Sequence, residues 1–204
     1  MTSEPTAASV SFITTEHFTL QGERSQTVSE ATGRASMFLA AVSGGLVALG
    51  LMATAAKIGT AFYALALTVL PTLAFVGLVT FDRVLQTRME DLIDALRIAR
   101  LRRFYFDHAP ELDAYLLNVP YEGRLRVQGL PEGPWQHFVT IAGMIAVVTS
   151  VLAGASVAVL VAVVSDHSLA GALVAGGVVA VALLGVMMRY QRVVWIDLRK
   201  RYDV

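Results

Sequence analysis

The sequence predicts an all-α integral membrane protein with four transmembrane helices, some of them extended into the cytoplasm. Hydrophobic residues make up 55% of the 204 residues and charged residues only 16%, whereas an ordinary soluble domain carries roughly 25% charge. No charged residue lies within four long segments, which are 36–56, 58–81, 138–165 and 168–188. A membrane-spanning helix needs about 20 apolar residues. These observations exclude a soluble enzyme, a disordered chain and a disulfide scaffold.

Residues 1–35 are expected to form a cytoplasmic tail and helix. The first thirteen residues contain no Lys or Arg, so they lack the positive n-region of a signal peptide. Thr14 or Thr15 is the expected N-cap, because threonine commonly caps helices. The helix then runs into the first apolar segment, residues 57–59 form a turn, and 60–81 returns. Residues 36–81 are therefore the first transmembrane hairpin.

Residues 82–134 are expected to be a cytoplasmic helix followed by a connection rich in Pro and Gly. An apolar seam at helical spacing continues the helix from Asp82 to Phe106, and it is too short for a coiled coil; its members are Leu85, Met89, Leu92, Leu96 and Ala99. Four prolines and three glycines interrupt 107–134. Within it, 111–117 could form a short helix, and 124–128 alternates like a very short strand.

The second transmembrane hairpin is predicted over 135–188. Trp135 and Phe138 mark its entry, since aromatic residues favour the headgroup level. Asp166 and His167 form the turn between a helix over 138–165 and another that starts near Ser168. Nothing after 188 breaks that last helix, so 189–204 is expected to be a basic cytoplasmic extension.

The distribution of basic residues predicts the orientation. Fifteen of the sixteen lie in the N-terminal lead, the 82–134 connection or the C-terminal tail, and Lys57 alone lies in a short turn. Under the positive-inside rule both termini are cytoplasmic. Since fourteen of the sixteen are Arg, the composition is typical of a GC-rich bacterial gene. The expected location is thus a bacterial inner membrane.

Catalytic and cofactor chemistry is not expected. Proton pumps and intramembrane proteases place ionisable groups at membrane depth, and the four segments contain none. The chain has no Cys, and its four His lie scattered at the polar ends, so we predict no metal site, no cofactor and no enzyme. The formal net charge of zero gives no reason to expect a nucleic-acid partner.

Two kinds of helix face stand out within the segments. Rows of small residues let helices approach closely in lipid, and their main members are Gly44, Ala146, Ser150, Gly154, Ala158 and Gly176. They could serve the bundle or a subunit interface. The second segment instead carries threonines beside a helix-kinking proline, at Thr60, Thr68, Pro71, Thr72 and Thr80. This face could be a packing surface or the uncharged wall of a pore.

Two basic clusters are predicted to contact anionic lipid headgroups, which attract Lys and Arg beside a membrane. One consists of Arg97, Arg100, Arg102 and Arg103, and the other of Arg189, Arg192, Arg199, Lys200 and Arg201. A cytoplasmic protein or an anionic signalling ligand is the alternative partner. At a pore mouth, the first cluster would give weak anion preference.

Three functional classes remain. The first is a self-associating channel or pore, including a membrane effector triggered from the cytoplasm. The second is a non-catalytic anchor or sensor subunit for a cytoplasmic partner. The third is a small transporter or a lipid-handling protein. We expect self-association, because four helices alone enclose little aqueous space.

Overall fold

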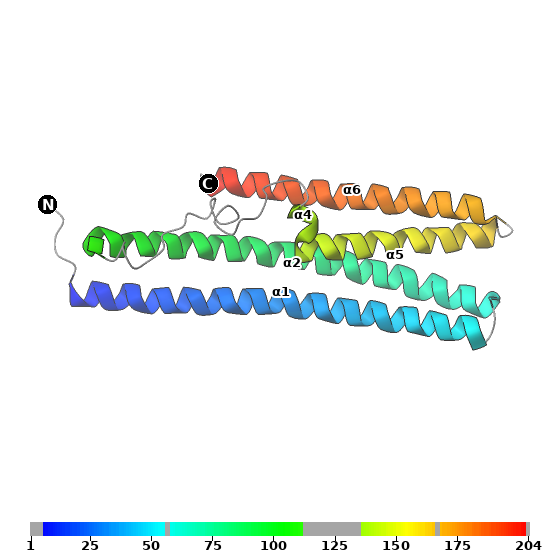
Figure 1. Ribbon diagram of the computed structural model, residues 1–204, viewed down its shortest axis with the longest axis horizontal. Helices are drawn as coiled ribbons and strands as arrows, with labels where there is room; N and C mark the ends of the chain where they lie inside the picture. Colours follow the sequence, from blue (N-terminus) through cyan, green and yellow to red (C-terminus); the bar gives the residue numbers. More distant parts are fainter. Residues whose placement is uncertain (1–5, 56–57, 112–135, 166–167, 203–204) are drawn as a thin grey trace. The chain divides into compact units, whose positions relative to one another are not determined.

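The computed structural model describes residues 6–55, 58–111, 136–165 and 168–202, and their regular structure is helical throughout. The long helices are α1 (Ala7–Ala55), α2 (Thr60–His108), α5 (Ile141–Val164) and α6 (Leu169–Tyr202), and a single turn, α4 (Gln136–Val139), precedes α5 (Figure 1). Each long helix is long and apolar enough to cross a membrane. The predicted all-α fold with four such helices is therefore confirmed.

The chain divides into two compact units. Unit 1 consists of Met1–Ala31 and Gln86–Gly133, and unit 2 consists of Thr32–Leu85 and Pro134–Val204. Both α1 and α2 contribute residues to each unit. The four charge-free segments all fall in unit 2, which also contains the basic end of the chain from Arg189 onward.

In unit 2, glycine allows α1 and α2 to pack closely. A Cβ on Gly45 would stand 2.7 Å from a methyl carbon of Leu73 and 3.1 Å from one of Val69. Towards the other end of this contact, a Cβ on Gly77 would meet the ring of Phe38 and the hydroxyl of Thr149. Since the residue numbers rise on one helix as they fall on the other, α1 and α2 run antiparallel. Thr149 brings α5 into the same core.

The helices α5 and α6 lie side by side as a second antiparallel pair (Figure 1). At their crossing, a Cβ on Gly154 would lie 2.5 Å from the carbonyl oxygen of Gly176, and a Cβ on Gly176 would lie 2.6 Å from that of Gly154. At this crossing there is room only for the Cα hydrogens of glycine and not for a Cβ atom. In unit 2 the end of α5 and the start of α6 lie at the same end as the end of α1 and the start of α2 (Figure 1).

Two predicted helix starts are wrong. Helix α1 begins at Ala7, and Thr6 caps it by accepting a hydrogen bond from the backbone N–H of Ser9 (3.3 Å). Thr14 and Thr15 lie inside the helix, where their hydroxyls donate to the carbonyls of Val10 and Ser11. No proline or glycine lies between Thr6 and Thr14, so the helix extends back to the earlier threonine.

The third apolar segment is also interrupted, since α5 does not start at Phe138. Thr140 has an extended backbone (φ −77°, ψ 156°) and its Oγ1 accepts from the N–H of Gly143, which makes it the N-cap of α5. The residues before it form the separate turn α4. The start of the fourth helix near Ser168 and the continuation of α2 beyond Asp82 agree with the prediction, and α2 ends at His108 rather than at Phe106. The expected helix over 111–117 and strand over 124–128 lie outside the described residues, apart from Glu111.

Unit 1 has a small apolar core of its own, to which α1 and α2 both contribute. Leu20, Leu92 and Ile98 are buried there. The predicted seam on α2 is therefore only partly right, because Ala99 is exposed and its neighbour Ile98 takes the buried position.

Candidate functional sites

The threonine row of α2 lies on the surface of unit 2. Thr60, Thr68, Pro71 and Thr72 are exposed, and Thr80 is half-buried. The hydroxyl of Thr68 donates to the carbonyl of Ala64 (2.9 Å), and that of Thr72 donates to the carbonyl of Thr68 (2.7 Å). The proton of each of these two hydroxyls is thus already used in a hydrogen bond within the helix. Each hydroxyl oxygen keeps lone pairs that can accept hydrogen bonds from outside.

Gly44 of α1 shares this surface. Gly45 faces Leu73 and Val69, and the residues one position earlier on each helix are rotated by about 100°. Because α1 and α2 are antiparallel, those two rotations carry Gly44, Thr68 and Thr72 to the same side of the hairpin. All three are exposed, and a Cβ on Gly44 would meet no atom within 4 Å. We call the surface formed by Gly44, Thr68 and Thr72 the hairpin face.

The small residues of α5 and α6 are used differently, because most of them lie inside unit 2. Ala146, Ser150 and Gly154 are buried, as is Gly176. A Cβ on Gly176 would stand 2.8 Å from that of Ala158, which is half-buried. The row on α5 therefore packs against α6 of the same chain. Gly44 is the one residue of the predicted packing set that is exposed in the described part of the chain.

The two predicted basic clusters belong to different units. Arg97 of unit 1 pairs with Asp94 at 3.4 Å, while Arg100, Arg102 and Arg103 are exposed. In unit 2, Arg201 pairs with Asp197 at 3.1 Å, and Arg189, Arg192 and Lys200 are exposed. The side chain of Arg199 lies outside the described residues.

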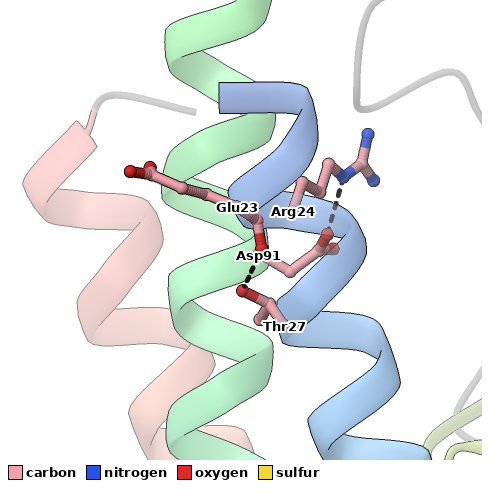
Figure 2. Close-up of polar contacts among 4 residues, drawn as sticks. All are labelled: Glu23, Arg24, Thr27 and Asp91. Carbon is pink, nitrogen blue, oxygen red and sulfur yellow. Dashed lines mark hydrogen bonds and ion pairs between the residues drawn. The ribbon is translucent and has the colours of Figure 1, made fainter. Parts of the chain in front are cut away.

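An ion pair joins α1 to α2 within unit 1. Nε of Arg24 donates to a carboxylate oxygen of Asp91 at 2.6 Å, and about a quarter of each side chain is exposed. Figure 2 shows the two terminal nitrogens of Arg24 directed away from Asp91, and the side chain of Glu23 extended away from the pair. The hydroxyl of Thr27 lies below, donating to the backbone carbonyl of Glu23 (2.9 Å).

Beside this pair, the surface of unit 1 carries an open groove of about 460 Å³. Four of its lining residues follow one face of α1 at helical spacing and two follow α2; they are Gln21, Arg24, Ser25, Val28, Ile98 and Arg102. Two are cations and none is an acid. Of these residues only Arg102 belongs to a basic cluster that is visible in the sequence, and Arg24 lies 78 positions away from it along the chain.

His17 lies near one end of the groove. Its ring nitrogen Nε2 is 2.8 Å from the amide nitrogen of Gln21, and its ring meets that of Tyr105 edge to face at a centroid distance of 6.0 Å. Burial, and then the positive charge of Arg102, lower the pKa of this imidazole below its ordinary value. Neutral His17 is therefore favoured, and its Nε2 can accept from Gln21.

Two buried polar side chains of unit 2 were not anticipated. Thr149 and Gln191 are both 0% exposed, and Oγ1 of Thr149 and both amide atoms of Gln191 lack a hydrogen-bond partner among the described residues. At the same end of α6, the hydroxyl of Tyr190 donates to Asp82 at 3.3 Å. The sequence pattern did not identify Gln191 as buried, because it is a polar residue between Tyr190 and Arg192, which are both exposed.

Over the described residues, no group of three His, Asp or Glu side chains could hold a metal ion. Comparison with known proteins gives no functional lead, because no protein family, no curated protein and no solved structure matches this chain.

Proposed function

We propose that the chain is a multi-pass protein of the cell membrane, with both termini in the cytoplasm, and that copies of it assemble into a channel or pore. The observation that carries the proposal is the exposed hairpin face. In lipid, helices associate through small residues and hydroxyls rather than through burial of apolar surface. Within the described chain, Gly154 and Gly176 already pack against each other, whereas Gly44, Thr68 and Thr72 remain exposed.

The polar atoms of α2 are suited to a pore wall that contacts water. The hydroxyls of Thr68 and Thr72 already donate within the helix, so neither leaves a donor without an acceptor, and both can still accept hydrogen bonds from water. Pro71 has no N–H for the carbonyl of Leu67, which frees a further acceptor on the same turn. An uncharged surface of this kind passes solutes without strong charge selection of its own.

The test is the current carried by the reconstituted full chain. The double substitution Thr68→Val with Thr72→Val keeps the side-chain shape and removes two hydroxyls, so it should favour dewetting and reduce the current. Thr15→Val with Thr19→Val is the matched control. These two threonines are exposed, are also four residues apart, and donate in the same way to Ser11 and Thr15.

A lower current only in the Thr68/Thr72 variant, with assembly unchanged, would support the pore. Equal currents in all three proteins would give these threonines a packing role. If the unmodified chain carries no current, the pore is wrong and the anchor or sensor class takes its place. Two features of unit 1 support the anchor or sensor function. Unit 1 has a separate core, and its groove is one that a cytoplasmic partner could reach.

A further inference from the structure

The groove of unit 1 has the chemistry of a binding site for a small anion. Its lining carries two guanidinium groups, an amide and a hydroxyl, over an apolar floor that includes the buried Ile98. Its volume of about 460 Å³ falls within the roughly 300–1,000 Å³ of small-molecule sites. All of its lining residues lie within one unit.

The two arginines differ in how far the chain itself satisfies them. Arg24 uses Nε for Asp91, and its terminal nitrogens are directed away from that carboxylate (Figure 2). Arg102 is exposed and makes no hydrogen bond or ion pair with another described residue. A guanidinium has five N–H donors, so most of the donors lining the groove have no acceptor among the described residues.

The acidic side chains near the groove do not supply acceptors for these remaining donors. Asp91 is held by Nε of Arg24, and Asp94, which is buried, pairs with Arg97. Glu23 extends away from Arg24 (Figure 2). The hydrogen bond to Asp91 engages Nε of Arg24 and leaves its two terminal nitrogens directed away from that carboxylate. Planar forks of this kind match phosphate oxygens two at a time.

We propose that this groove binds a phosphate-bearing anion, whose oxygens accept from Arg24 and Arg102, with Gln21 and Ser25 as further polar partners and Val28 and Ile98 against its apolar part. The phosphate could belong to a soluble compound or to a lipid headgroup. The recognition chemistry is the same in both cases. The site does not depend on whether unit 2 conducts.

The experiment measures binding of inorganic pyrophosphate and of short-chain phosphatidic acid to the full chain in detergent at low salt, by the shift in its unfolding temperature. The test variant is Arg102→Gln, which removes a charge that no described residue pairs with. Arg103→Gln is the matched control, because Arg103 is the adjacent exposed arginine and does not line the groove. Both variants change the net charge equally.

Arg102→Gln should weaken binding at least about tenfold, because it removes hydrogen bonds made by a charged group, and Arg103→Gln should change it less than about twofold. Ser25→Ala should cause a smaller loss. A response to both probes assigns a phosphate site open to soluble ligands, and a response to phosphatidic acid alone assigns a lipid headgroup. Equal losses in the two arginine variants, or no binding of either probe by the unmodified chain, would overturn the proposal.

Discussion

Gly154 and Gly176 set the distance between α5 and α6, because each leaves room for the backbone of the other. We expect Gly154→Leu to lower the stability of the protein, since overpacking a close contact costs about 1–3 kcal/mol. The unfolding temperature in detergent measures the loss. Gly177→Leu is the control, because a Cβ at Gly177 would meet nothing within 4 Å. Equal melting of the two variants would contradict the close contact.

His17 should make the stability of unit 1 depend on pH. Its pKa in the folded chain lies below the ordinary value of 6.5, so the unfolded chain binds the proton more readily. The stabilisation is complete above that ordinary value and is lost as the pH falls through the lowered pKa. Unfolding temperatures at about pH 7.5 and about pH 5.5 should therefore differ less in His17→Gln than in the unmodified chain. His108→Gln, at an exposed histidine, should keep the full difference.

The Arg24–Asp91 pair joins two helix segments that are far apart in sequence. Asp91→Asn removes the charge but keeps the shape, and we expect a loss on the order of 1 kcal/mol, as for pairs that are partly exposed to water. High salt should reduce the difference, because it screens the attraction. Thermal unfolding at low and high salt would measure both effects. Asp107→Asn, at an exposed acid, should be neutral.

At the scale of the elements, the α1/α2 hairpin differs from the α5/α6 pair. The small residues of α5 and α6 fill their own contact, whereas the hairpin face is exposed. If copies associate through this face, Gly44→Leu should yield a smaller assembly without lowering the stability of the single chain, because a Cβ at this exposed position would meet no atom within 4 Å.

The mass of the purified complex in detergent tests whether Gly44→Leu reduces the size of the assembly. Gly185→Leu provides the comparison, since Gly185 is an equally open position on α6. An unchanged complex in the Gly44 variant would place the hairpin face against lipid.

At the scale of the whole molecule, the topology can be tested directly because the chain contains no Cys. Cysteines at Ile58 and Ser168, both exposed next to the hairpin turns, should react with a membrane-impermeant reagent added outside intact cells. Cysteines at Asp107 and Lys200, also exposed, should react only after the cells are opened. The opposite pattern would reverse the proposed orientation.

The sequence alone determined the fold class and the four apolar helices. Long segments without charge have one stable form in an apolar medium, because only a helix satisfies its own backbone there. The sequence alone did not determine the start of α1, since Thr6, Thr14 and Thr15 are all suitable N-caps. The N-cap at Thr140 was not predicted, because the hydrophobicity of a segment does not mark a change in its backbone direction.

The tertiary structure alone decided which small residues meet. Rows on α1, α5 and α6 look alike in sequence, yet only the packing shows that Gly154 lies against Gly176 while Gly44 stays exposed. The groove of unit 1 likewise depends on contact between distant segments, since Arg24 and Arg102 share it only when α1 and α2 pair. Helical periodicity fixes which residues share one face of one helix. It carries no information about which face of another helix lies opposite.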